Sequence, residues 1–281
     1  MSSEIKFVYI NGKMLPRSEA KVSCFDEGVT HGWAIYEGIR VYDSKILSID
    51  EHIDRLYDSA KGAFIKIPLT KVEFRKAVID TVKINGFTDA HIMPWVSYGE
   101  KSGSPTIVIP ARPAKTEMGK EVKAIVSSIR RTSCDSIDPK IKTNSRLDLC
   151  LAGLEAKQSN VDYAIMLDRD GFVAEVSMAN IFIIKKNKLL TPFTTHALAG
   201  ITRELLMDFF VKEKYHVEER NLTFQDLYTA DEIFLCGTGA EIKAIVEVDG
   251  RVIGSGRIGP ITKKAVDLYW KFIIESGEPI Y

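Results

Sequence analysis

The sequence feature that most constrains the fold is a short stretch, Pro110 to Lys120, that interrupts the hydrophobic patterning of the chain. It contains two prolines, one glycine and no sustained apolar period, which is typical of a linker. Strand-like and helix-like patterns alternate on both sides of it. The 281 residues leave room for two domains. We predict a small N-terminal α/β domain at residues 1–110, a linker at 111–120 and a larger C-terminal α/β domain at 121–281.

Turn and capping signals define the elements of the N-terminal part. Asn11-Gly12 between two apolar runs is the strongest short signal for a β-hairpin. Ser48 with Glu51, and Thr70 with Glu73, have the spacing of a capping box, which marks the start of a helix. The predicted elements are hairpin strands at 7–10 and 13–15, a hairpin within 39–47, helices over 49–66 and from 71 to about 86, and strands at 91–98 and 106–109.

The C-terminal part alternates between short apolar runs and amphipathic segments, which indicates strands connected by helices. The predicted strands are 122–127, 163–167, 172–175, 180–184, 233–235 and 242–248, and the predicted helices are 146–158, 201–214 and 260–274.

Composition excludes several classes of function. Lys+Arg and Asp+Glu both number 38, so the net charge is zero, which argues against a nucleic-acid binder or a protein held on a membrane surface by positive charge. No run of about 18 apolar residues predicts a membrane span. Four scattered cysteines without CxxC pairs favour reduced thiols and a cytoplasmic location. The five histidines lack metal-ligand spacing, so we expect no metal site, and the common nucleotide and hydrolase motifs are missing.

Four local features contain residues that could take part in catalysis or bind a ligand. Lys142 lies in a polar stretch before a helix, where a solvated surface lysine is the ordinary interpretation. Glu175 alternates with apolar strand residues and is either an exposed carboxylate or a buried one that needs a partner. Gly200-Ile201 opens an amphipathic helix whose free N–H groups suit an anion such as phosphate, or it is a plain helix start. Gly237-Thr238-Gly239 forms a turn where a ligand can approach the backbone.

These features belong to a series of motifs that runs in order through nearly the whole chain. The motifs are Tyr9-Ile10-Asn11-Gly12, Tyr36-Glu37-Gly38-Ile39-Arg40, Asp50-Glu51-His52-Ile53-Asp54-Arg55-Leu56, Ala174-Glu175, Ala179-Asn180-Ile181-Phe182, Gly200-Ile201-Thr202-Arg203, Gly237-Thr238-Gly239-Ala240-Glu241 and Ile258-Gly259-Pro260-Ile261-Thr262. Together they resemble the fold-type IV aminotransferases that depend on pyridoxal 5'-phosphate. This class includes branched-chain amino acid aminotransferases, D-amino acid aminotransferases, (R)-amine transaminases and aminodeoxychorismate lyases, and the segments are most similar to the branched-chain group.

The resemblance implies a role for several residues. Lys142 would form the internal Schiff base with the cofactor and would shuttle a proton during transfer. Glu175 would keep the pyridine nitrogen protonated, which makes the ring a better electron sink. The residues implied for the cofactor phosphate are Arg55, Ile201, Thr202 and Thr238. Because active sites of this class form between subunits, a homodimer or higher homo-oligomer is also implied.

The expected substrate pocket departs from the branched-chain pattern. Branched-chain enzymes carry Tyr-x-Arg-Pro where this chain has His91-Ile92-Met93-Pro94, and a thioether cannot pair with the side-chain carboxylate of glutamate. Either another cation such as Arg40 replaces that arginine, or the amino donor is not glutamate. His31 lies at a position where (R)-amine transaminases often have a histidine and branched-chain enzymes have a tyrosine, so this position is similar to the (R)-amine group. The expected substrate-binding residues are His31, Tyr36, Arg40, Met93, Trp95, Thr238 and Gly239.

The sequence therefore predicts a transaminase that moves an amino group between a hydrophobic, branched-chain amino acid and a 2-oxo acid. The alternatives are a D-amino acid or (R)-amine:pyruvate transaminase, an aminodeoxychorismate lyase and a degenerate scaffold without activity. The expected partners are a small amino acid or amine and a 2-oxo acid, with no nucleic acid and no membrane.

Overall fold

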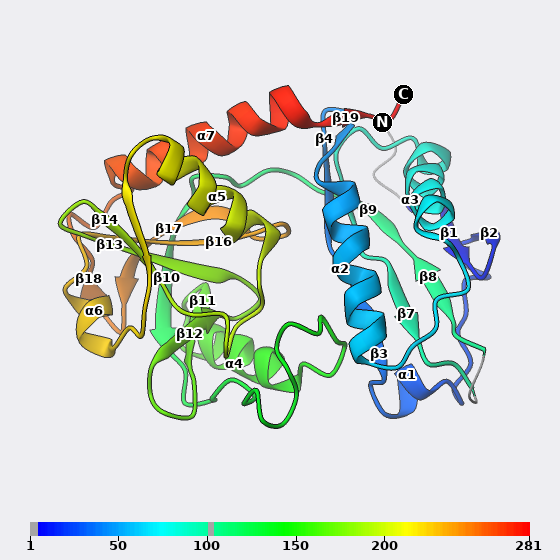
Figure 1. Cartoon of the computed structure of the whole chain (residues 1–281), viewed down its shortest axis with the longest axis horizontal. Coiled ribbons are helices and arrows are strands. Elements are labelled where there is room, and N and C mark those ends of the chain that lie inside the picture. The colour runs from blue at the N-terminus through cyan, green and yellow to red at the C-terminus, as the bar shows by residue number, and fades with distance from the viewer. Residues whose placement is uncertain (1–4, 101–103) are drawn as a thin grey trace. The chain divides into compact units, whose positions relative to one another are not determined.

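The computed structural model describes residues 5–100 and 104–281, which form two compact units (Figure 1). The first unit runs to Lys115 and also includes 141–145 and 272–281, and the second comprises Thr116–Lys140 and Arg146–Lys271. The change from one unit to the other falls inside the stretch that we predict as a linker, although its first residues, Ala111–Pro113, form a strand. The limits 1–110 and 121–281 stay a prediction.

The first unit contains two five-stranded sheets, in the orders β2-β1-β8-β7-β3 and β19-β5-β4-β6-β9, together with α2 and α3. Its strands are β1 (Phe7–Ile10), β2 (Lys13–Pro16), β3 (Ala34–Tyr36), β4 (Ile39–Tyr42), β5 (Lys45–Ile46), β6 (Ala90–Ile92), β7 (Trp95–Ser97), β8 (Ile107–Ile109), β9 (Ala111–Pro113) and β19 (Glu278–Pro279). Its helices are α1 (Glu27–Thr30), α2 (Ile49–Gly62) and α3 (Lys71–Asn85). Both predicted hairpins and both predicted helices of this part are confirmed.

Three segments of the first unit pass from one sheet to the other. The chain leaves β3 for β4 at Glu37-Gly38, β6 for β7 at Met93-Pro94, and β8 for β9 at Pro110. Proline cannot donate a ladder hydrogen bond, so Pro94 and Pro110 suit points where strands end. The strand that we predict at 91–98 is therefore two strands in different sheets. The crossing points are tied together, because the Glu37 N–H donates to the Pro94 carbonyl (2.8 Å).

One of the two predicted capping boxes is present. Thr70 is extended (φ −70°), its side chain accepts from the Glu73 N–H, and Glu73 accepts from the Thr70 N–H. Ser48 has a left-handed backbone (φ 50°) and makes no side-chain capping bond, so the capping box that we predict with Glu51 is wrong. The predicted helix over 49–66 also ends earlier, at Gly62, and Phe64 just beyond it has φ 55°.

A nine-stranded mixed sheet forms the centre of the second unit, where β10 pairs parallel with β11 and β17 and most other pairs are antiparallel. Its strands are β10 (Glu121–Val126), β11 (Tyr163–Leu167), β12 (Val173–Val176), β13 (Asn180–Lys185), β14 (Lys188–Thr191), β15 (His216–Glu219), β16 (Glu232–Gly237), β17 (Glu241–Val248) and β18 (Arg251–Val252). The helices are α4 (Leu147–Gln158), α5 (Ile201–Lys212), α6 (Phe224–Tyr228) and α7 (Pro260–Ser276). Every strand and helix predicted for this part is present within a few residues of its predicted bounds.

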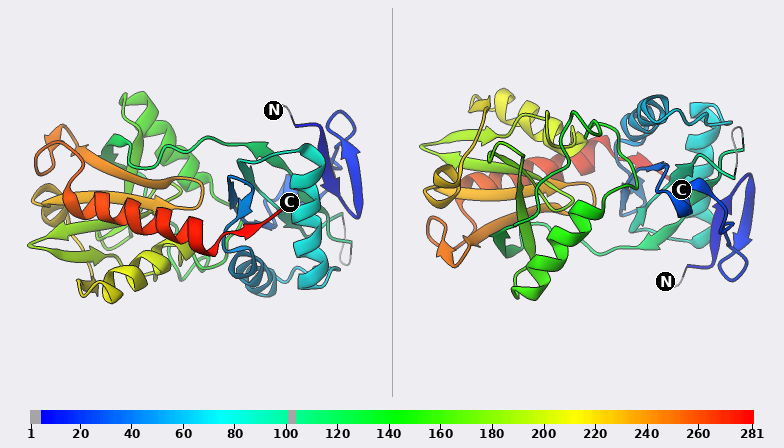
Figure 2. Two further views of the ribbon diagram at one scale, coloured as in Figure 1. Left: turned by 90° about the horizontal axis from the view of Figure 1, so that it is seen from above. Right: turned by 90° about the horizontal axis from the view of Figure 1, so that it is seen from below.

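Helix α7 starts beside the central strands of the second unit, where Figure 2 shows it next to β16 and β17. Glu232 on β16 accepts hydrogen bonds from the N–H groups of Ile261 (3.0 Å) and Thr262 (2.8 Å), in the first turn of α7. A carboxylate at this end of a helix also opposes the positive end of its dipole. Within residues 5–100 and 104–281, no helix is both long and apolar enough to cross a bilayer. In the same residues, no group of three or more His, Cys, Asp or Glu side chains is arranged so that it could hold a metal ion.

Candidate active site

Lys142 lies on an irregular segment that contacts β3 through one isolated antiparallel bridge, between Ile35 and Thr143. Its N–H donates to Ser59 Oγ (3.1 Å), and its carbonyl accepts from the Tyr36 N–H (2.9 Å). One residue further on, Thr143 Oγ1 donates to the Ala34 carbonyl (3.0 Å). These bonds fix the backbone on both sides of the lysine.

Lys142 is half-buried, and its amine lies against an aromatic ring. Its Nζ is 4.7 Å from the centroid of the Tyr36 ring, in the geometry of a cation–π contact. Tyr36 is directly opposite Trp95 on β7, so the structure brings three of the predicted residues together. Lys140, the nearest alternative lysine, is exposed.

A buried carboxylate, Glu37, organises the neighbouring part of the first unit. It accepts from Arg55 Nε (2.7 Å), from Arg55 Nη2 (2.9 Å) and from His52 Nδ1 (2.8 Å). Burial raises the pKa of the Glu37 carboxyl, but Arg55 and His52 outweigh this effect and hold that pKa well below its usual range. Glu37 thus fixes Arg55 through two of the five N–H groups of the guanidinium.

We expect Glu37→Gln to lower the free energy of unfolding by about 3 kcal/mol at pH 7, because it leaves a largely buried arginine without its opposite charge. The pKa of Glu37 is lower in the folded chain than in the unfolded chain. Its stabilisation is therefore complete above the unfolded pKa of about 4.3 and is lost as the pH falls through the folded pKa. Urea unfolding of both proteins at pH 7 measures the difference, and a series that continues below pH 4 follows its decline.

A matched control for that experiment lies on the same helix. Asp54 pairs with Lys71 (2.7 Å), and both side chains are more than half exposed. Such a pair contributes at most about 1 kcal/mol, so Asp54→Asn is expected to unfold almost like the parent protein. Equal losses in the two variants would contradict a special role for Glu37.

The remaining predicted pocket residues of the first unit are more dispersed. Arg40 on β4 is buried, and its guanidinium lies 4.7 Å from the centroid of the Tyr42 ring. Met93 follows β6, where its N–H donates to the Pro110 carbonyl (3.0 Å). The His31 side chain is 69% exposed and pairs with Glu27 (2.7 Å), so the structure gives it a surface position at the end of α1.

Glu175 lies on β12 of the second unit and is buried, which decides between the two interpretations of its sequence pattern. Its Oε1 is 2.5 Å from Arg131 Nε, and Arg131 Nη1 also contacts Asp148. Burial raises the pKa of Asp148, but Arg131 and the N–H groups of Thr132 and Leu149 lower it by more. Arg131 thus lies between two carboxylates and supplies the opposite charge that a buried carboxylate requires.

The predicted anion site at the start of α5 has the required backbone. Gly200 is the N-cap and provides no side-chain cap, so the first N–H groups of a 12-residue helix lack a partner from that residue. A Cβ on Gly200 would lie 1.9 Å from Asn180 Oδ1, so only glycine fits. Thr202, in the first turn, is buried. A helix start of this kind favours a phosphate.

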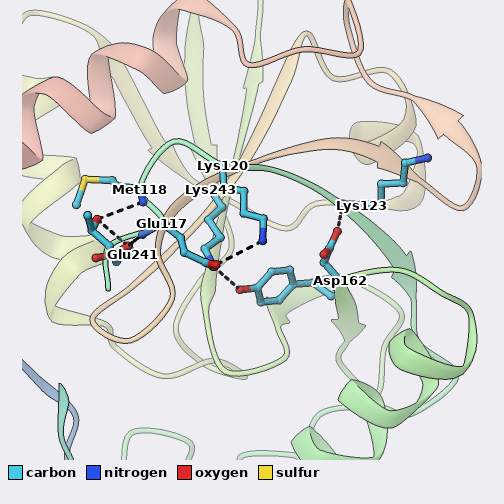
Figure 3. A network of polar contacts seen from close by, with 9 residues as sticks. Glu117, Met118, Lys120, Lys123, Asp162, Glu241 and Lys243 are labelled. Atoms are coloured by element: carbon cyan, nitrogen blue, oxygen red, sulfur yellow. Dashed lines mark hydrogen bonds and ion pairs between the residues drawn. The ribbon is translucent and has the colours of Figure 1, made fainter. Parts of the chain in front are cut away.

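The turn that contains Thr238 and Gly239 joins β16 to β17 and is anchored by a polar network (Figure 3). Glu241 closes the turn with φ 61°, and its Oε2 accepts from the Glu117 N–H (2.6 Å). Lys243 Nζ donates to Glu117 Oε2 (2.6 Å), and its side chain is largely buried. This network fixes the end of the turn against the segment that starts the second unit.

Sequence reasoning missed four residues of this arrangement: Glu37, His52, Arg131 and Asp148. Glu37 and His52 lie inside the motifs given above, and that membership was the available signal. Arg131 and Asp148 have no such signal, because their proximity to Glu175 depends on how β11, β12 and α4 pack.

Comparison with known proteins assigns the family. The amino-transferase class IV family matches residues 34–248. A putative branched-chain-amino-acid aminotransferase of Methanocaldococcus jannaschii is 41% identical, over 98% of this chain and 99% of its own length. The branched-chain-amino-acid aminotransferase of Escherichia coli is 33% identical over 97% and 94%. The crystal structure of the Escherichia coli enzyme superposes with a TM-score of 0.92 at 32% identity, over 95% of this chain and 94% of that one.

The chain therefore belongs to the class IV aminotransferases. Enzymes of this class depend on pyridoxal 5'-phosphate, so the protein is a PLP-dependent transaminase whose substrates are an amino acid and a 2-oxo acid. Its relatives are of the branched-chain type. The two-domain α/β architecture of fold type IV and the cofactor, both implied by the sequence motifs, are confirmed.

Proposed function

We propose that this protein is a branched-chain amino acid aminotransferase, which moves the amino group of leucine, isoleucine or valine to a 2-oxo acid. The observation that carries the proposal is the lysine amine held beside Tyr36 in a chain with branched-chain relatives along almost its entire length. Tyr36, Trp95 and Met93 are apolar or aromatic, which suits an aliphatic side chain.

The residues present fit pyridoxal phosphate by their chemistry. Lys142 would hold the cofactor aldehyde through Nζ, and Arg55, the first N–H groups of α5 and the hydroxyls of Thr202 and Thr238 would hold its phosphate dianion. Glu175 would accept a hydrogen bond from the protonated ring nitrogen. When bound, the cofactor supplies a ring that accepts the electron pair left on the substrate carbon.

The protein's own contribution is to hold these groups and to move a proton. The bonds from Ser59 and Tyr36 to the Lys142 backbone keep the amine at a fixed place. Once the substrate amine has displaced it from the cofactor, Nζ would take the proton from the substrate Cα and deliver it to the cofactor carbon C4′, which is general acid–base catalysis by a positioned amine. Arg131 would keep Glu175 in place for the ring nitrogen.

A half-reaction without a 2-oxo acid tests this function. We expect L-leucine, L-isoleucine and L-valine to convert the absorbance of the bound cofactor to that of its amino form. D-leucine is expected to leave the absorbance unchanged, because the proposed enzyme is specific for L-amino acids. A spectrum that responds to D-alanine or (R)-1-phenylethylamine and to none of the branched-chain amino acids would replace this proposal with the D-amino acid or (R)-amine alternative.

Two further properties belong to the same proposal. The four cysteines, without a disulfide framework, support a cytoplasmic location, and active sites shared between subunits in this class support a homodimer or higher homo-oligomer.

A further inference from the structure

Asn180, the first residue of β13, is buried although its side chain is polar. Its Nδ2 donates a hydrogen bond to the Leu198 carbonyl (2.9 Å), on the segment that leads into α5. A carbonyl oxygen only accepts hydrogen bonds, so the amino group of the Asn180 amide must face Leu198 and the amide oxygen must face away from it. This bond therefore fixes the orientation of the side chain.

The amide oxygen of Asn180 lies against the N-cap of α5. A Cβ on Gly200 would be 1.9 Å from Asn180 Oδ1, so this oxygen fills the space that a side chain at position 200 would need. The amide thus holds the segment before α5 at two points, Leu198 and Gly200. Because the first N–H groups of a helix have no partner within it, the place where α5 begins determines what they can bind.

The same segment also contacts Glu175, the residue proposed for the ring nitrogen of the cofactor. The Leu198 N–H donates to Glu175 Oε2 (3.4 Å), so Leu198 presents its N–H to β12 and its carbonyl to β13. A hydrogen bond of 3.4 Å is longer than usual and holds less firmly than the 2.9 Å bond from Asn180. Asn180 is therefore the main side-chain contact that holds the Leu198 backbone.

The backbone of Asn180 lies beside the strand that leads to Thr238. Asn180 is paired with Cys236 in the ladder between β13 and β16, and Thr238 follows two residues after Cys236. A Cβ on Gly237, between them, would be 3.8 Å from the Ala179 Cα, so the two backbones run next to each other up to the turn. Asn180 therefore links two of the groups proposed for the cofactor phosphate, the start of α5 through its side chain and Thr238 through its backbone.

We propose that Asn180 is a positioning residue, which sets the spacing between the start of α5 and Thr238 and thereby determines the affinity for the cofactor phosphate. This proposal rests on the proposed transaminase function, in which these two groups hold the phosphate. A phosphate dianion is bound tightly only when its donors converge, because each hydrogen bond depends on distance and angle. Asn180 acts through the backbone at 198–200 and does not itself have to touch the cofactor.

Cofactors with and without a phosphate provide the test. The full-length apoenzyme is titrated with pyridoxal 5'-phosphate and with pyridoxal, and the absorbance of the lysine-bound cofactor gives the two affinities. We expect Asn180→Ala to weaken the affinity for pyridoxal 5'-phosphate by about 10- to 100-fold, which corresponds to the loss of one or two well-directed hydrogen bonds to a charged group. The affinity for pyridoxal is expected to stay the same, because pyridoxal has no phosphate to bind at α5 and Thr238.

Three further variants make the experiment specific to Asn180. Asn180→Asp keeps the size of the side chain, but a carboxylate cannot donate to the Leu198 carbonyl and adds a negative charge near the phosphate, so the loss should exceed that of Asn180→Ala. Asn221→Asp, the same change at an exposed position of the second unit, is expected to change neither affinity. In a Thr238→Val background, Asn180→Ala should cost less than in the parent protein, since one of the groups whose spacing it sets is already lost.

The ratio of the two affinities separates positioning from general damage. If Asn180→Ala and Asn180→Asp weaken both cofactors equally and also lower the thermal stability of the apoenzyme, Asn180 is only a structural residue and the proposal is overturned. Unchanged affinity for pyridoxal 5'-phosphate in either variant would overturn it as well. A failure of the proposed function looks different: no branched-chain amino acid would react in the parent enzyme, while a loss confined to pyridoxal 5'-phosphate in Asn180→Ala would still support the role of Asn180.

Discussion

Replacing Lys142 with alanine is expected to abolish transaminase turnover together with the absorbance band of the lysine-bound cofactor. One amine has two tasks here, covalent attachment and proton transfer. Proton transfer by a positioned group alone contributes about 10²- to 10⁴-fold, so we expect kcat to fall by at least about 10³-fold. The absorbance spectrum and the rate with L-leucine and 2-oxoglutarate measure the two tasks separately.

Two variants make the experiment specific to this amine. Lys140→Ala removes an exposed lysine two residues earlier and is expected to retain the spectrum and the activity. Lys142→Arg keeps a positive charge beside the Tyr36 ring but cannot form the attachment, so it should behave like Lys142→Ala. Normal activity in Lys142→Ala, or loss of the absorbance band in Lys140→Ala, would show that the lysine is wrongly assigned.

The two capping boxes show what local sequence can and cannot predict. Ser48–Glu51 and Thr70–Glu73 have the same spacing, but only the second forms. A capping side chain reaches the helix N–H groups from an extended backbone. Thr70 has that backbone, whereas β5 ends at Ile46 and the tight entry into α2 forces Ser48 into the left-handed region. Spacing predicts the helix start, and tertiary structure decides how it is capped.

The environment of the lysine could not be derived from patterns within its own segment. Lys142 lies in an irregular stretch, and its partners on β3 are about a hundred residues earlier in the chain. The resemblance to known motifs identified the residue, but only the contacts with β3 and Ser59 show how its backbone is held. Contacts of this kind depend on how distant segments pack. Hydrophobic periodicity predicts helices and strands but not this packing.

The partners of buried charged residues are the second feature that could not be predicted from the sequence. Alternation along β12 left Glu175 either inside or outside, and the structure places it inside with Arg131 as its partner. Glu37 follows the same rule, since it is buried only together with Arg55 and His52. A sequence can indicate that a carboxylate on an apolar strand needs a partner, but the identity of the partner follows from the fold.

The second large effect is expected at Glu175. Glutamine keeps the size of the side chain but removes its negative charge, so it would no longer hold the cofactor ring nitrogen in its protonated form. The ring would then be a poorer sink for the electron pair on the substrate carbon. Losing one preorganised electrostatic interaction of this kind costs about 10²- to 10³-fold in kcat, which is the loss that we expect for Glu175→Gln. Stopped-flow measurement of the leucine half-reaction reports this step directly.

A structural role for Glu175 would give a different result. Glu175→Gln also leaves Arg131 with one carboxylate, Asp148, so stability must be measured by thermal unfolding alongside the rate. Glu175→Asp keeps the charge and should recover part of the rate, whereas Asp208→Asn, an exposed position on α5, should change neither rate nor stability. If Glu175→Gln lowers stability but the rate constant of the folded enzyme is unchanged, Glu175 serves only to pair with Arg131, and the ring nitrogen must be held by another group.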